Sequence, residues 1–183
     1  MTLSMYAKIG LIIISIWVTN ICRAQQADSG CLEQANDFTY ILASGEQQTL
    51  YAIQAEMVLL YFYDPTCEDC HLLMSQLEAS DIVNSLIDEK KLTVLAVYPD
   101  DDMETWNEYA GHIPPQWING YDKGVKIHTE GIFLIKSFPT LYLLDKDKMI
   151  RMKEMTFEEL EGVLSIETSP LPLSKGDRNE TSP

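Results

Sequence analysis

The segment Val58-Leu59-Leu60-Tyr61-Phe62-Tyr63-Asp64-Pro65-Thr66-Cys67-Glu68-Asp69-Cys70-His71 decides the fold of this chain. Its first half is an uninterrupted apolar run that ends at a proline turn, which is typical of a buried strand. Two cysteines three positions apart follow, where a helical pattern begins. Cysteines at this spacing can close a small disulfide, and the first lies near the positive end of the helix dipole, which favours its thiolate. The segment therefore predicts a dithiol at the end of a buried strand.

The residues after Cys70 predict a βαβ unit. Leucines at helical spacing indicate a helix, and Ser80-Asp81 is a fresh cap at which this helix kinks or restarts. Leu92–Tyr98 is a second near-continuous apolar run, which indicates a strand buried on both faces. A strand, a helical crossover and a second strand of these lengths predict parallel pairing.

The rest of the chain predicts further helices and a hairpin. The expected elements are a helix at Met103–Tyr109 capped by Asp100–Asp102, a structured loop at Gly111–Gly124 that buries Trp117, a short helix at Lys123–Thr129, a hairpin of Leu141–Leu144 with Met149–Lys153, and a last helix opened by a capping box of Thr156 and Glu159.

The first 24 residues have the pattern of a secretory signal peptide. Lys8 provides a positive start, Ile9–Val18 is apolar, and Cys22-Arg23-Ala24 offers small residues at the cleavage positions. The apolar run is short for a membrane span, so cleavage after Ala24 is expected, with an uncleaved N-terminal anchor as the alternative. Export would place the cysteines in an oxidising compartment.

The chain is strongly acidic. Its 28 acidic and 13 basic residues give a formal charge of −15, and loss of Lys8 and Arg23 with the signal leaves 28 acids against 11 bases, or −17. Such a surface repels phosphate groups, which argues against nucleic acid and anionic membrane surfaces as partners.

The order of elements and motifs resembles the thioredoxin superfamily. The resemblance rests on Cys-x-x-Cys at a helix start and on Phe138-Pro139-Thr140 before the hairpin. The Asp64–Cys67 segment, the Trp106 helix and the loop at 117–122 are similar to exported bacterial thiol–disulfide oxidoreductases of the TlpA type. The resemblance implies an α/β, thioredoxin-like fold: a mixed central sheet, built from the parallel βαβ unit and the C-terminal hairpin, flanked by helices.

The residue patterns, together with a resemblance that covers about Gly45 to Ser165, divide the chain into four parts. They are a signal peptide at 1–24, a lead-in with an amphipathic helix at 25–44 (the helix at Cys31–Ala43), a thioredoxin-like domain at 45–166, and a disordered tail at 167–183.

The resemblance also implies roles for individual residues. Cys67 would be the exposed nucleophile, and Cys70 the more buried cysteine that resolves the mixed disulfide. Pro139 would be the family's cis-proline, which leaves the backbone of Phe138 free to pair with a substrate strand. The only redox group expected is the Cys67–Cys70 disulfide, with no other cofactor and no metal.

Three features depart from the family pattern. Many thioredoxins have a buried acid where this chain has Tyr61, so the proton acceptor for Cys70 is open, with Asp64 and Glu68 as candidates. Glu68 and Asp69 oppose a thiolate at Cys67, which favours the disulfide form and predicts a reductant. Phe138 is bulky for its position, which predicts an unusual substrate preference.

Other functions fit parts of the pattern. Cys67-x-x-Cys70-His71 also matches the attachment motif of c-type haem, in which His71 would ligate iron. A zinc site would need a second Cys/His pair at suitable spacing, which the sequence lacks. Cys31 is expected to be a buried core cysteine, with a dimer bridge or a regulatory partner as alternatives. His112 and His128 are expected to be ordinary surface residues.

The sequence thus predicts an exported, periplasmic enzyme that reduces or exchanges protein disulfides. Its partners would be exported disulfide-bearing proteins and a membrane or periplasmic electron donor, with no nucleic acid and no stable membrane insertion after signal cleavage. The alternative is a non-catalytic thioredoxin-like binding module with a structural Cys67–Cys70 disulfide.

Overall fold

A single buried strand, β3 (Met57–Phe62), lies at the centre of the structure, which is a computed structural model that describes residues 33–168. The predicted signal peptide, Cys31 and the tail from Ser169 lie outside the described residues. One structural unit begins at Gln34, and of the residues before it only Glu33 is described.

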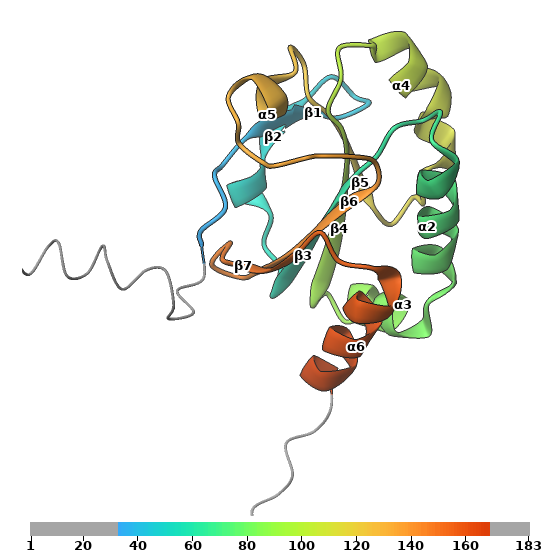
Figure 1. The fold of residues 1–183 in the computed structure, drawn as a ribbon, viewed down its shortest axis with the longest axis vertical. Helices are drawn as coiled ribbons and strands as arrows, with labels where there is room; N and C mark the ends of the chain where they lie inside the picture. Colours follow the sequence, from blue (N-terminus) through green and yellow to red (C-terminus); the bar gives the residue numbers. More distant parts are fainter. Residues whose placement is uncertain (1–32, 169–183) are drawn as a thin grey trace, which may run out of the picture. The chain divides into compact units, whose positions relative to one another are not determined.

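The elements follow one another as β1 (Thr39–Ile41), β2 (Gln47–Thr49), the 3-10 turn η2 (Leu50–Ala52), β3, α2 (Glu68–Ala79), α3 (Asp81–Asp88), β4 (Leu92–Tyr98), α4 (Met103–Tyr109), η3 (Ala110–His112), β5 (Ile118–Tyr121), α5 (Lys126–Thr129), β6 (Thr140–Asp145), β7 (Ile150–Lys153) and α6 (Phe157–Thr168) (Figure 1).

The strands of the described chain form one mixed, seven-stranded sheet in the order β2-β1-β5-β4-β3-β6-β7. Strand β3 pairs in parallel with β4 through the helical crossover, which confirms the predicted βαβ unit. It pairs antiparallel with β6 on its other side, and β6 turns back into β7 as the predicted hairpin. The thioredoxin-like architecture expected from the motifs is therefore present.

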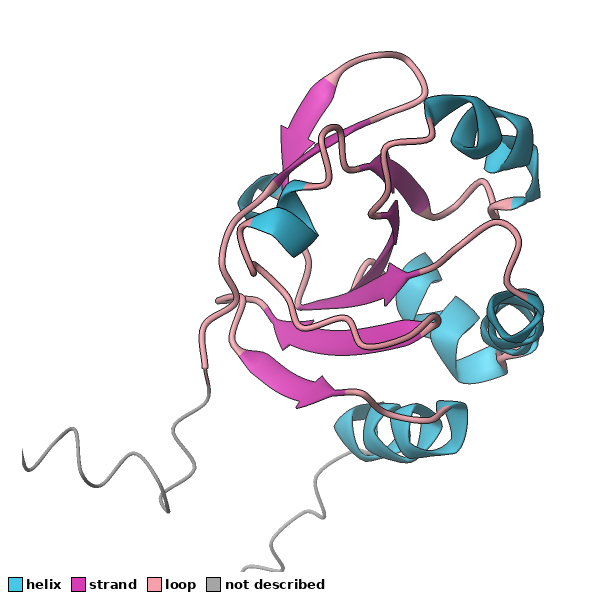
Figure 2. Cartoon of the chain, turned by 45° about the horizontal axis from the view of Figure 1, so that its top comes forward, coloured by secondary structure: helices cyan, strands magenta, loops and turns pink. Residues whose placement is uncertain are grey.

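Helices cover both faces of the sheet (Figures 1 and 2). Helices α2, α3, α4 and α6 pack on one face, where Leu59 and Tyr61 of β3 join their apolar side chains. The other face holds η2, α5 and Phe133, and β3 contributes Val58, Leu60 and Phe62 there. Every side chain of β3 after Met57 is buried, because alternate residues of a strand enter opposite layers.

The predicted helix boundaries are confirmed where a local cap signals them. The Ser80 hydroxyl accepts a hydrogen bond from the N–H of Val83, which separates α2 from α3. Asp102 caps α4 through the N–H of Thr105 at 3.0 Å. The Thr156 N–H donates to Glu159 Oε2 at 2.9 Å, and the Glu159 N–H donates to Thr156 Oγ1 at 3.2 Å, as a capping box requires.

The predicted N-terminal helix is wrong over its described part. Residues 33–38 are irregular, and Thr39–Ile41 is strand β1, paired with β2 and with β5. The apolar residues Phe38 and Tyr40 sit two positions apart, which is strand spacing, and both are buried. Pairing with distant strands decides this conformation, so the local pattern was insufficient.

Strand β5 lies inside the segment predicted as a loop. It joins β1 to β4, and Gly120 in its middle makes room for the Tyr40 ring. A Cβ added at Gly120 would lie 2.9 Å from Tyr40 Cδ2 and 3.1 Å from Tyr40 Cβ. Gly120, which helped to hide the strand from the sequence pattern, is thus required by the packing of Tyr40. Trp117, just before β5, is buried as predicted.

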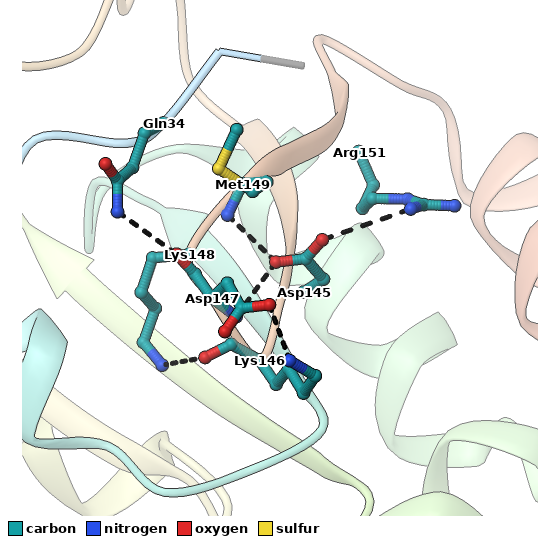
Figure 3. Close-up of polar contacts among 7 residues, drawn as sticks. All are labelled: Gln34, Asp145, Lys146, Asp147, Lys148, Met149 and Arg151. Atoms are coloured by element: carbon teal, nitrogen blue, oxygen red, sulfur yellow. Dashed lines mark hydrogen bonds and ion pairs between the residues drawn. The ribbon is translucent and has the colours of Figure 1, made fainter. Parts of the chain in front are cut away.

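The turn between β6 and β7 holds the segment that leads to β1 (Figure 3). Asp145 Oδ1 accepts hydrogen bonds from the N–H groups of Asp147 and Met149, each at 3.0 Å, which closes the turn. Gln34 Nε2 donates to the Asp147 carbonyl at 3.3 Å, and the buried Lys148 donates through Nζ to the Ile53 carbonyl at 3.0 Å. Burial lowers the pKa of Lys148. This turn therefore ties three chain segments together at the end of the sheet where β3 begins.

We expect Gly120→Ala to lower the free energy of unfolding by about 1–3 kcal/mol, because the added methyl group forces Tyr40 from its buried position. Gly162→Ala in α6 is the control, since a Cβ there meets nothing within 4 Å. That variant is expected to raise the free energy of unfolding by about 0.5–1 kcal/mol. Urea unfolding followed by circular dichroism measures both, and equal effects would contradict the packing of Tyr40 over Gly120.

Candidate active site

The candidate site begins where the chain leaves β3. Asp64 Oδ1 accepts hydrogen bonds from the Thr66 N–H at 2.7 Å and the Thr66 hydroxyl at 2.6 Å, which fixes the turn around the buried Pro65. This turn delivers Cys67 to the N-cap position of α2. The proline and the short polar residues of the sequence therefore place the first cysteine at the positive end of a helix.

Cys67 and Cys70 lie one helical turn apart and differ in exposure. The Cys70 N–H donates to Cys67 Sγ at 3.2 Å, and both cysteines are free, so the structure holds the dithiol. Cys67 is partly exposed, whereas Cys70 is 0% exposed. Burial raises the pKa of the Cys70 thiol, the hydrogen bond with Cys67 adds to this, and the backbone amide of Asp64 acts in the opposite direction. Cys67 is thus the accessible sulfur of the pair.

The second half of the site comes from the segment before β6. The Phe138-Pro139 peptide bond is cis, which confirms that prediction. The Cys67 thiol donates to the Phe138 carbonyl, with 3.7 Å between the sulfur and the oxygen. The pairing of Phe62 with Thr140 in the sheet brings these two distant segments together. The roles predicted for Phe138 and Pro139 in substrate binding stay predictions.

Tyr61 occupies the interior position for which the family pattern suggested an acid. Its hydroxyl donates to the Cys70 carbonyl at 2.8 Å, and the residue is 1% exposed. Burial, followed by the nearby Cys70, raises the pKa of Tyr61 well above its ordinary value. The phenol therefore acts as a donor that secures the first turn of α2, and it supplies no negative charge to the buried thiol.

Neither candidate proton acceptor makes a contact through its carboxylate with the Cys70 sulfur. The Asp64 carboxylate is engaged by Thr66, and Glu68 is exposed in the first turn of α2. Among residues 33–168, no carboxylate makes a hydrogen bond to the Cys70 sulfur. Neither candidate is therefore supported by a contact.

A polar group that the sequence did not reveal lies beneath the site. Asn119 Oδ1 of β5 accepts hydrogen bonds from the Tyr63 hydroxyl and from Trp106 Nε1, each at 3.0 Å. The Asn119 Nδ2 and Trp117 Nε1 atoms are buried, and in the described chain neither has a partner. Trp117 packs edge-to-face on Tyr61, with ring centroids 6.2 Å apart. Tyr63, which directly follows β3, is thereby joined to β5 and α4, and Tyr63 and Trp106 belong to the same core cluster as Cys70.

A stack of three rings was also missed. His71, Tyr109 and His112 lie nearly parallel, with ring centroids 5.3 Å apart for the first pair and 4.7 Å for the second. His71 follows Cys70 on α2, whereas Tyr109 and His112 come from the end of α4 and from η3. Only the topology could have suggested this stack, because segments that follow neighbouring parallel strands meet at one edge of the sheet. The prediction of His112 as an ordinary surface residue is therefore incomplete.

The geometry does not suit the c-type haem reading of the motif. His71 Nε2 donates to the Pro65 carbonyl at 2.8 Å, since a carbonyl oxygen can only accept. Haem attachment would need both sulfurs to be reached, and Cys70 is fully buried. Within residues 33–168, no three His, Cys, Asp or Glu side chains are grouped so that they could hold a metal ion. In the same range, no helix is both long enough and apolar enough to cross a membrane.

Comparison with protein families agrees with this fold. A family model described as thioredoxin-like matches residues 55–150. The chain belongs to the thioredoxin-like family. The match spans β3, both cysteines and the cis-proline, and ends at the first residue of β7. No match was found among curated proteins.

Solved structures of thioredoxin-like proteins are similar over most of the chain. A thioredoxin-like protein from Bacteroides caccae is 38% identical with a TM-score of 0.72, and the alignment covers 81% of this chain and 54% of that one. The C-terminal domain of a Bacteroides fragilis protein is also 38% identical, with a TM-score of 0.70 and coverage of 72% and 94%. The present chain thus spans about half the length of the Bacteroides caccae protein.

The thioredoxin domain of a thiol-disulfide oxidoreductase from Bacteroides vulgatus shares the fold at lower identity. It is 20% identical with a TM-score of 0.65, and the alignment covers 77% of this chain and 100% of that domain.

The difference in exposure predicts selective alkylation of this thioredoxin-like protein. In the reduced, native state, iodoacetamide should modify Cys67 at least about tenfold faster than Cys70, because only the first sulfur reaches solvent and the second is held as a thiol. Peptide mass spectrometry quantifies both products. In concentrated urea the two rates should converge, and faster native labelling of Cys70 would contradict the assigned burial.

The Tyr61 hydroxyl predicts a measurable contribution to stability. Tyr61→Phe should lower the free energy of unfolding by about 1–2 kcal/mol and increase native alkylation of Cys70, since the carbonyl at the first turn of α2 loses its donor. Tyr142→Phe is the matched control, because the Tyr142 hydroxyl donates to the Leu134 carbonyl at the same 2.8 Å but on the other face of the sheet. A Cys70 alkylation rate that rises equally in both variants would contradict the role given to Tyr61.

Proposed function

We propose that this protein is a thiol–disulfide oxidoreductase whose reacting groups are Cys67 and Cys70. The observation that carries the proposal is the asymmetric dithiol at the start of α2, with one accessible and one buried sulfur. The thioredoxin-like family to which the chain belongs, and the likeness of its fold to a thiol-disulfide oxidoreductase domain, support it.

The proposed reaction has two displacements. The Cys67 thiolate attacks one sulfur of a client disulfide, a mixed disulfide forms, and the client's other sulfur leaves as a thiolate that takes up a proton. The Cys70 thiol then loses its proton to solvent and attacks Cys67 Sγ, which forms the Cys67–Cys70 disulfide and releases the second client thiol. Two electrons pass from the dithiol to the client, and no other cofactor takes part.

The helix start assists the first displacement. The Cys70 N–H points at Cys67 Sγ, and the sulfur occupies the N-cap, so a negative charge there is favoured by the helix dipole. The burial of Cys70 keeps the second sulfur protonated until Cys67 is in the mixed disulfide. This order of events matches the roles expected of the two cysteines.

The charges around the pair favour a reductant. Glu68 and Asp69 lie in the first turn of α2, and residues 61–72 contain no lysine or arginine. A strong oxidant requires a dithiol stabilised as its thiolate, and these carboxylates act against that stabilisation. We therefore propose that electrons flow from the protein to its clients.

The proposed setting is the periplasm, reached through the predicted signal peptide at residues 1–24 or with this segment retained as an anchor. Clients would be exported proteins that carry disulfides, and a membrane or periplasmic donor would reduce the Cys67–Cys70 disulfide again. The backbone beside Pro139 would pair with an extended client segment, because the Phe138 carbonyl lies next to the reacting sulfur.

Single cysteine variants test the proposal with a neutral peptide disulfide and dithiothreitol as the electron source. Cys67→Ser should abolish catalysed reduction, since no nucleophile remains, and Cys70→Ser should accumulate a mixed disulfide that mass spectrometry detects. Cys31→Ser makes the same change outside the pair and should retain the wild-type rate. Unaltered reduction by Cys67→Ser, or no catalysis by the unmodified protein, would support the non-catalytic binding module instead.

A further inference from the structure

A shallow cavity of about 260 Å³ adjoins the nucleophile, and the proposed chemistry does not use it. One wall is formed by Pro65 and Thr66, which lead directly into Cys67. The other wall is formed by the exposed side of α4 and η3, through Thr105, Glu108, Tyr109 and His112. Any client held at Cys67 would therefore place a neighbouring side chain at this cavity.

Apart from the Tyr109 hydroxyl, which can donate or accept, the side-chain groups that line the cavity offer hydrogen-bond acceptors. The hydroxyl hydrogens of Thr66 and Thr105 are donated to Asp64 and Asp102, at 2.6 and 2.7 Å, so their oxygens offer only lone pairs. Within residues 33–168, the Glu108 carboxylate makes no hydrogen bond or ion pair.

The imidazole of His112 leaves an acceptor as well. His112 Nδ1 faces the Tyr109 carbonyl at 3.3 Å and must carry the proton of that contact, which leaves Nε2 as an acceptor in the neutral ring. A side chain that has donors and no acceptor fits such a lining.

The charge around the cavity also favours a side chain that only donates hydrogen bonds, namely a cation. Residues 64–72 and 100–112, which form and flank the cavity, contain no lysine or arginine. They contain eight carboxylates: Asp64, Glu68, Asp69, Asp100, Asp101, Asp102, Glu104 and Glu108. The hydrogen-bond donors given to Asp64, Asp101 and Asp102 are neutral. The partly exposed ring of Tyr109 suits the methylene stem of a long basic side chain.

We propose that this cavity receives a lysine or arginine side chain next to the client's cysteine, so the preferred substrates are disulfides in basic segments. The inference rests on the proposed function and names its substrate class. Complementary charge would speed encounter with such clients, and Glu108 would pair with the bound cation. The stacking of Tyr109 between His71 and His112 holds this wall of the cavity against α2.

Three blocked peptide disulfides of one sequence test the inference, with lysine, glutamine or glutamate on both sides of the cysteine. The reduced protein is mixed with each peptide in single turnover, and the released thiol is measured. Flanking lysines raise the intrinsic reactivity of a disulfide. Each rate constant is therefore divided by the rate constant with which dithiothreitol reduces the same peptide. We expect the normalised rate constant to be highest for the lysine peptide, intermediate for the glutamine peptide and lowest for the glutamate peptide. The highest and lowest values should differ by about tenfold at low ionic strength and by less at high salt.

The Glu108→Gln variant separates the effect of the cavity carboxylate from the effect of the protein's overall negative charge. This variant should lower the ratio of the lysine rate to the glutamine rate by about twofold to fivefold. Glu158→Gln is the matched control, because it removes the same charge from an exposed carboxylate in the first turn of α6. It should leave the ratio unchanged. An equal loss in both variants would overturn the cavity assignment.

The remaining outcomes separate this inference from the proposed function. Equal normalised rates for the three peptides, or a preference for glutamate, would overturn the basic-segment proposal while the enzyme hypothesis stands. No reaction with the neutral glutamine peptide would overturn the proposed function, and the substrate preference with it.

Discussion

The pairing of β3 with two neighbours of opposite direction is the constraint on which the site depends. Parallel pairing with β4 places Cys67 at the same sheet edge as the segment that leads into α4. Antiparallel pairing with β6 brings Phe138 to that edge from the other side, so that its carbonyl lies 3.7 Å from Cys67 Sγ. A slip of one residue in either register would turn the alternate side chains of β3 to the wrong layer. The dithiol, the cis-proline and the cavity beside Cys67 are therefore consequences of one buried strand.

The interior behind the dithiol is neutral, whereas its surface is acidic. Tyr61 gives its hydrogen bond to the Cys70 carbonyl and brings no charge to the buried sulfur. The carboxylates of Glu68 and Asp69 lie outside, on the exposed side of the first helical turn. Burial disfavours a thiolate at Cys70, whereas Cys67 is partly exposed at the N-cap of α2. This division assigns attack to one sulfur and resolution to the other.

Local signals in the sequence predicted much of the fold. The βαβ unit, the Ser80 restart, the Thr156–Glu159 capping box and the final hairpin each depend on residues close together in the chain, and all are present. Strands β1 and β5 were mistaken for a helix and a loop, because both are short and are stabilised by pairing with distant strands and by the packing of Tyr40 on Gly120. For the site, the cysteines and Phe138-Pro139 could be found from motifs. The Tyr109 stack and the cavity could not, because they join segments that follow different strands.

The reduction potential of the Cys67–Cys70 pair, measured by equilibration with glutathione buffers, tests the account most directly. Carboxylates flank the dithiol, and residues 61–72 provide no lysine or arginine that would stabilise its reduced form. The account therefore predicts a potential of about −200 mV or below, in the reducing range. A potential near −120 mV, roughly that of a strong oxidase, would contradict it.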